Sequence, residues 1–206
     1  MLADPNDVTT DPPDDRFVAL VLPDDEWITE FLDQEQAATR IVVGSTMFFP
    51  RLVQTGAYAR AVLKDKDDVE ACVATRLRRQ DVLTRTRFLA FLHYPTFRTP
   101  LVAPADMAEQ ARKLLELGAR DNVTIRIVPE QAGYTPLANG PFGYLEFRAA
   151  TPVVQLEHLR HGISFWHARV VESVQRSIDQ LDECALDPAA SAAFIAAEAD
   201  RWTGLG

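Results

Sequence analysis

The sequence predicts an α+β domain: a small mixed β-sheet packed with helices, with a helical lobe formed by the N-terminal region. An apolar run over residues 88–92 and an alternating pattern over 123–127 flank a helical segment at 106–117. Such a strand, helix and strand are compatible with a right-handed parallel crossover. Short strands spaced closely enough for hairpins follow, so the same sheet is expected to hold antiparallel pairs as well.

Each further element rests on a local pattern. Apolar residues near a helical period predict helices over residues 25–42 and 69–83, and the second follows an Asp-rich stretch that suits a helix N-terminus. Gly118 stands where the helix over 106–117 is expected to end. The remaining expected elements are a loop over 131–141, strands over 142–147, 153–157 and 162–166, a helix over 167–181, and a last helix that begins at Asp187 and Pro188.

Length and composition favour one folded domain. The chain has 206 residues, of which 47% are hydrophobic, enough to bury one substantial core. Residues 1–15 are rich in Asp and Pro and poor in apolar side chains, so we expect a disordered acidic tail there and a single domain over 16–206. The sequence has neither a run of membrane-spanning length nor a secretory signal pattern, and we expect a cytoplasmic protein.

The charge balance argues against nucleic acid as a partner. Lys and Arg total 21 against 30 acidic residues, a formal net charge of −9. Binding to phosphates would require a local basic patch. The nearest candidate is formed by Arg76, Arg78, Arg79, Arg85 and Arg87, which we interpret as a solvated or salt-bridged helix face.

A stretch near the first quarter of the chain carries a family resemblance. It reads Phe49-Pro50-Arg51-Leu52-Val53-Gln54-Thr55, then two residues, then Tyr58-Ala59-Arg60-Ala61. It resembles the hydrophobic-Pro-Gly-Leu-Leu-Gln-Thr and Tyr-Ala-Arg-Ala signature of a domain of unknown function in actinobacterial, antitoxin-like transcriptional regulators of the WhiJ type. Arg51 and Val53 depart from that signature. The resemblance continues through residues 76–85, 114–117, 122–129 and 132–133, and extends to the C-terminal helices.

The resemblance implies a regulatory module. In that family the domain follows an N-terminal helix-turn-helix, and a small acidic protein encoded beside the regulator is the implied partner. Here only some two dozen residues precede the helix expected at 25–42, which would correspond to the connector between the two parts. We therefore expect a stand-alone ligand- or partner-binding domain that has lost its DNA-binding module, with no nucleic-acid binding of its own, no membrane association and a possible homodimer.

The histidines suggest an alternative. Three of them, His158, His161 and His167, fall within ten positions, and His93 and Tyr94 end a strand expected in the same sheet. Imidazole transfers protons near neutral pH, and a phenol can donate to an oxyanion. The candidate catalytic residues are His158, His161, Tyr94 and Glu157. The candidate ligand-binding residues are His93, Arg98, Tyr134, Tyr144, Phe165, Trp166 and His167.

These residues leave three function classes open: the regulatory module; the same fold recruited as a small-molecule enzyme, such as a cyclase or isomerase of secondary metabolism; and DNA binding through an unrecognised surface. The sequence holds no phosphate-binding glycine loop, nucleophile elbow or His-Glu-x-x-His motif. A His-x-x-His spacing at 158–161 is weak support for zinc, because a third ligand is missing. We expect no metal and no cofactor.

Overall fold

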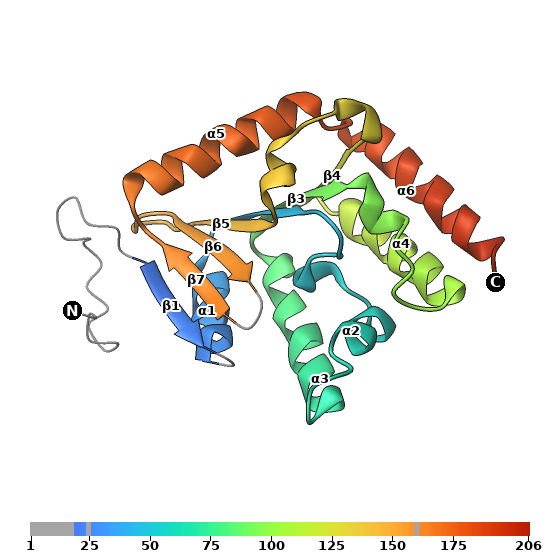
Figure 1. The fold of residues 1–206 in the computed structure, drawn as a ribbon, viewed down its shortest axis with the longest axis horizontal. Helices are drawn as coiled ribbons and strands as arrows, with labels where there is room; N and C mark the ends of the chain where they lie inside the picture. The colour runs from blue at the N-terminus through green and yellow to red at the C-terminus, as the bar shows by residue number, and fades with distance from the viewer. Residues whose placement is uncertain (1–18, 24–25, 159–160) are drawn as a thin grey trace.

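A computed structural model describes residues 19–23, 26–158 and 161–206. It confirms an α+β fold (Figure 1), built on one seven-stranded mixed sheet in the order β1-β7-β6-β5-β2-β3-β4. The strands are β1 (Ala19–Pro23), β2 (Arg40–Ser45), β3 (Arg87–His93), β4 (Val123–Val128), β5 (Phe142–Glu146), β6 (Val153–His158) and β7 (His161–Phe165). The acidic tail predicted for residues 1–15 lies outside the described residues.

The sheet changes character at β2. On one side β2, β3 and β4 run parallel, and the helix α4 (Pro104–Gly118) joins β3 to β4, as the strand-helix-strand pattern predicted. On the other side β5, β6, β7 and β1 pair antiparallel. As a result the carboxyl ends of β1, β2, β3, β4 and β6 share one edge of the sheet with the first residues of β5 and β7.

Three helices pack on one face of the sheet, and one helix and a loop pack on the other. One core gathers apolar side chains of β2, β3 and β4 with α2 (Gly56–Val62), α4 and α6 (Pro188–Thr203). The opposite face packs against α5 (Ala168–Cys184) and the 129–141 loop. In Figure 1, α5 lies across the top of the sheet, while α2 and α3 (Val69–Arg79) project below it.

The predicted helix over residues 25–42 is wrong over its last five residues, 38–42. Helix α1 covers Glu26–Ala37, and Arg40 already starts β2. Strand β2 lies between β3 and β5, and a hydrophobic core covers each of its faces, so Ile41 and Val42, which lie on opposite faces, are both buried. A strand buried on both faces reads as a continuous apolar run without alternation, and β-branched residues favour it.

Two smaller differences concern helices. The predicted helical lobe comes from α2 and α3, whose contact buries a small separate cluster of Ala59, Leu63 and Val73, more than from the N-terminal stretch. Helix α4 ends at Gly118, as predicted, but the residue that caps it, Ala119, has a right-handed helical conformation and not the left-handed one that glycine favours. Among the described residues, no helix is both long and apolar enough to cross a membrane.

Candidate ligand-binding site

A hollow of about 320 Å³ opens at the sheet edge where β2 ends and β5 begins. Residues 46–54 form one of its walls, and they include the first half of the family signature over residues 49–61. We call these signature residues the motif, and the space the motif hollow. Helices α1, α2 and α3 supply the other walls through Glu35, Val62 and Arg76, and β5 and β6 supply Gly143, Gln155 and Glu157. Its lining residues are Glu35, Val43, Gly44, Ser45, Thr46, Met47, Phe48, Phe49, Pro50, Arg51, Leu52, Gln54, Val62, Arg76, Pro141, Phe142, Gly143, Gln155 and Glu157.

The polar residues of the motif hold this wall in place. The Gln54 side-chain amide donates to the Phe49 carbonyl at 2.7 Å, which folds residues 49–54 back on themselves. Thr55 caps α2 by accepting from the Tyr58 backbone N–H at 3.2 Å. The buried Gln110 of α4 accepts from the Thr55 backbone N–H and donates to the Val53 carbonyl, both at 2.8 Å.

The aromatic residues of the motif are core residues. Tyr58 is fully buried, and its hydroxyl accepts from the Phe49 backbone N–H at 3.4 Å. Burial raises the pKa of Tyr58 to about 12, so this phenol stays neutral. Phe49 packs edge-on against both Tyr58 and Phe97. These motif residues therefore determine the shape of the wall. The charged groups that a ligand could contact are other side chains of the hollow.

Three arginines and two glutamates form a charged cluster at the hollow: four of them, Glu35, Arg51, Arg76 and Glu157, line it, and Arg79 joins them through its ion pair with Glu35. Arg79 and Glu35 form a buried two-pronged ion pair, with N···O distances of 3.1 and 2.8 Å. Arg51 forms an ion pair with Glu157. Arg76 donates at 2.9 Å to the side-chain oxygen of Gln54, a neutral group, and among the described residues no carboxylate is within ion-pairing distance of it.

The field in the hollow is positive. With every group ionised, the three guanidiniums and two carboxylates sum to one positive charge. Burial, reinforced by Arg79 and Arg76, holds the pKa of Arg51 well below its usual range. Burial and the proximity of Arg79 lower the pKa of Arg76 to about 10. Burial is the main cause of both shifts, and Arg76 remains protonated at neutral pH.

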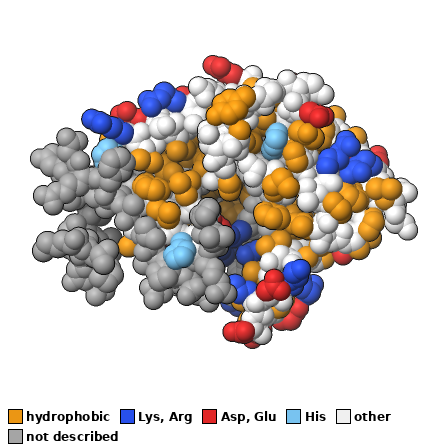
Figure 2. All heavy atoms as spheres, in the orientation of Figure 1, with side chains coloured by type: hydrophobic (Ala, Val, Ile, Leu, Met, Phe, Trp, Pro, Cys, Tyr) orange, Lys and Arg blue, Asp and Glu red, His pale blue; other side chains and the backbone are white. Residues whose placement is uncertain are grey.

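Apolar side chains rim the opening. Six large hydrophobic side chains are exposed among the described residues, and three of them line the hollow: Met47, Phe48 and Val62, exposed by 44, 52 and 41%. Figure 2 shows hydrophobic side chains around a recess near the middle of the molecule, with basic side chains inside it. Apolar walls with a few convergent polar groups are typical of small-molecule sites.

The floor of the hollow is ordered by an amide network. The Gln155 amide donates to the Gln34 side-chain oxygen at 2.6 Å, and the Ser164 hydroxyl donates to the same atom at 3.3 Å. Gln34 in turn donates to Glu30 at 2.6 Å. These bonds attach α1 to β6 and β7, directly beside the Glu35–Arg79 ion pair.

The structure does not bring the predicted catalytic cluster together. His158 and His161 are cross-strand partners in β6 and β7, and the position of the His158 side chain lies outside the described residues. Tyr94 follows β3, four strands away from β7, which corresponds to about 19 Å at the usual strand spacing. Tyr94 contacts His93 edge-on at 5.1 Å, while Glu157 lines the motif hollow.

The predicted ligand-binding residues lie in several separate places, and none of them lines the described part of the motif hollow. Arg98, exposed, pairs with Glu198 at 2.6 Å, and Tyr134 is 81% exposed beside Asn139. Tyr144 is buried and Phe165 packs against it in the α5 core, and both therefore act as core residues. Trp166 and His167 follow β7 at the opposite edge, where the His167 ring caps α5. Burial lowers the pKa of His93, which ends β3.

The sequence analysis singled out the arginines of the motif hollow but did not predict that they lie together. Arg76 and Arg79 were interpreted as a solvated or salt-bridged helix face, and Arg79 is indeed salt-bridged, but buried. Arg51 was noted as a departure from the family signature. Periodicity could not predict that α3 turns two of its arginines toward α1 and the 49–54 segment, because that depends on helix packing.

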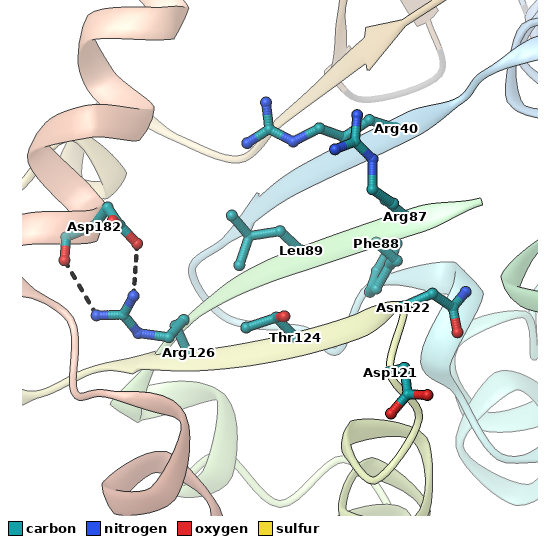
Figure 3. A pocket seen from close by; sticks show the side chains of 9 residues that line it. All are labelled: Arg40, Arg87, Phe88, Leu89, Asp121, Asn122, Thr124, Arg126 and Asp182. Carbon is teal, nitrogen blue, oxygen red and sulfur yellow. Dashed lines mark hydrogen bonds and ion pairs between the residues drawn. The ribbon is translucent and has the colours of Figure 1, made fainter.

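A second hollow, of about 240 Å³, lies at the other edge of the parallel strands (Figure 3), and we call it the Arg126 hollow. It is lined by Arg40, Arg87, Phe88, Leu89, Asp121, Asn122, Thr124, Arg126 and Asp182. Arg126 turns toward Asp182 and also donates to the carbonyls of Ala185 and Leu186. Arg40 pairs with Glu146 at 2.7 Å. Among the described residues, no group of three or more His, Cys, Asp or Glu could hold a metal ion.

Comparisons with known proteins identify the family of this chain, and the function of that family is unknown. No curated protein matches the sequence. Among solved structures, an archaeal chromatin protein, TrmBL2, gives a TM-score of 0.43 at 12% identity, over 87% of this chain and 56% of that one. The phospholipase D family member Nuc from Salmonella typhimurium gives 0.45 at 8% identity, over 84% and 98%. The model of a domain of unknown function, DUF5753, matches residues 28–197, and the chain belongs to that family.

Proposed function

We propose that this protein is the effector-binding domain of a regulator of the WhiJ type, and that the motif hollow is where the effector binds. The observation that carries the proposal is the hollow itself: a space of about 320 Å³ with an exposed apolar rim and a poorly compensated arginine inside. The family signature forms its wall, so the part of the chain that carries the resemblance also shapes the site.

Binding is favoured over catalysis by the lining. The described residues around the hollow include no His, Cys or Lys, and both of its glutamates are engaged by arginines. A general base needs a free lone pair within reach of the substrate. The cyclase or isomerase alternative relied on His158, His161 and Tyr94, and His161 and Tyr94 stand four strands apart.

The hollow is also suitably placed to pass on a signal. Its wall includes Glu35 of α1, the helix that the resemblance makes a connector. An occupant beside the Glu35–Arg79 pair and the Gln34 network changes the forces that hold α1 on the sheet. A ligand shifts such an equilibrium by the difference in its affinity for the two positions of the helix.

Native mass spectrometry of the protein purified from its source cells tests the proposal. Val62→Trp places a large ring at the mouth of the hollow, and Leu205→Trp is the matched control, because Leu205 is also exposed but lies near the C-terminus. We expect a co-purifying small molecule with the wild type and the control, and its loss with Val62→Trp. A co-purifying small acidic protein that is indifferent to Val62→Trp would instead favour partner binding.

A further inference from the structure

We infer that the occupant of the motif hollow is a small organic acid, whose carboxylate binds Arg76 and displaces Glu157 from Arg51, with its apolar body against Met47, Phe48 and Val62. This rests on the proposed function and adds the class of ligand. Three observations carry it: the bonding of Arg76, the position of Glu157 and the composition of the rim.

Arg76 is the group that receives the anion. A guanidinium has five N–H donors and forms its strongest hydrogen bonds with a carboxylate, frequently in pairs. Here the one bond that Arg76 makes among the described residues is to the neutral Gln54 side chain, at 2.9 Å. Arg76 is only partly exposed, so water compensates its charge incompletely. A carboxylate in the hollow supplies the missing counter-charge.

Glu157 acts as an internal competitor. It is the ion-pair partner of Arg51, but its side chain is 45% exposed while that of Arg51 is 16% exposed. The carboxylate can therefore move into solvent while the guanidinium stays in the hollow. Glu35 is different, because its side chain is only 10% exposed and Arg79 holds it with two bonds. An incoming acid replaces the outer carboxylate and leaves the inner one in place.

Size and the composition of the rim narrow the ligand further. The space of about 320 Å³ is at the small end of ligand sites. Val62 and Phe48 form apolar contacts at the mouth, so the acid carries a compact apolar body.

Displacement of the fluorescent anion 1-anilinonaphthalene-8-sulfonate from the full chain tests this inference. The competitors are 4-phenylbutyrate and its uncharged amide, 4-phenylbutyramide. We expect 4-phenylbutyrate to compete at least about tenfold better than the amide, since a hydrogen bond to a charged group is worth about one power of ten or more in affinity.

The variants locate the effect. Arg76→Gln is expected to weaken 4-phenylbutyrate about tenfold, while Arg78→Gln, on the same helix but exposed and bonded to Thr75, leaves it unchanged. Glu157→Gln is expected to strengthen the acid severalfold, a gain that a merely damaged fold would not give. Melting temperatures of all variants show whether each is folded.

The outcomes separate the two proposals. If the acid and the amide compete equally and Arg76→Gln changes neither affinity, the affinity of the hollow does not depend on the charge of the ligand. That result overturns this inference and leaves the proposed function standing. If no competitor binds in a manner that Val62→Trp abolishes, both fail. A co-purifying ligand that is neutral or cationic also overturns the inference alone.

Discussion

The two hollows use the same residue type in opposite ways. In the Arg126 hollow, Arg126 directs four hydrogen bonds at protein acceptors: the side chain and carbonyl of Asp182 and the carbonyls of Ala185 and Leu186. These bonds attach the end of α5 to the sheet. In the motif hollow, the one bond that Arg76 makes within the described part of the chain is to a neutral amide. An arginine with its donors used by the protein is structural, and one with donors to spare is available to a ligand.

The largest expected effect concerns the inner ion pair of the motif hollow. Arg79→Met leaves the Glu35 carboxylate buried without its partner, and we expect unfolding to become easier by about 3–5 kcal/mol. Denaturant unfolding measures the change. Arg60→Met is the control, because it removes an ion pair of similar geometry with Glu70 that is open to solvent. Equal midpoints for the two variants would mean that the Arg79 pair contributes no more than a surface pair.

The next effect separates structure from binding. Arg126→Met leaves the carbonyls at the α5–α6 junction without their donor, and we expect a loss of about 2 kcal/mol in the free energy of unfolding. The affinity for 4-phenylbutyrate, measured by calorimetry, is expected to stay unchanged. A lower affinity in this variant at a temperature where it remains folded would contradict the division between the two hollows.

A pH titration sharpens the assignment of Arg76. The pKa of Arg76 is about 10, and an anion binds its protonated form, so affinity for 4-phenylbutyrate is expected to be flat near neutrality and to fall as pH rises past that value. At pH 11 the fall is about tenfold, since one unit above the pKa leaves about a tenth of the group protonated. Arg76→Gln is expected to abolish this step. A step that persists in that variant would assign the titration to another group.

The smallest effect is on acid stability. Burial lowers the pKa of His93, so between its ordinary value near 6.5 and its lower folded value the unfolded chain binds more protons. Stability is therefore full above the ordinary value and falls as pH decreases through this window. His93→Asn is expected to flatten the stability curve between pH 7 and 5, as measured by thermal unfolding. Identical slopes in the two proteins would show that His93 does not contribute.

Local patterns predicted much of the fold and little of the site. The β3-α4-β4 unit, the strands of the hairpins and the last helix follow from period, proline and capping signals within short windows. Strand β2 was missed because a strand buried on both faces has no alternation to detect. Strand β1 pairs with β7, more than a hundred residues later, and no local signal contains that pairing.

Prediction of the site required the order of the strands and the packing of the helices, which a short stretch of sequence does not contain. His158, His161, His167, His93 and Tyr94 were grouped by closeness in sequence and by a guess at strand neighbours, but the order of strands puts β6, β5 and β2 between β7 and β3. Of the predicted catalytic residues whose side chains the structure describes, Glu157 lines the motif hollow, and Tyr94 and His161 do not. Arg51 was visible as a departure from the family signature, where glycine is expected, yet its role depends on Arg76 and Arg79 arriving from α3.

The most direct test of the account is a crystal structure with 4-(4-bromophenyl)butyrate, located by the anomalous signal of bromine. We predict the bromine among Met47, Phe48 and Val62, and the carboxylate within hydrogen-bonding distance of the Arg76 guanidinium, with Glu157 turned away from Arg51. A bromine signal in the Arg126 hollow, or a carboxylate bound away from Arg76, would contradict the central claim that the motif hollow is the anion-binding site.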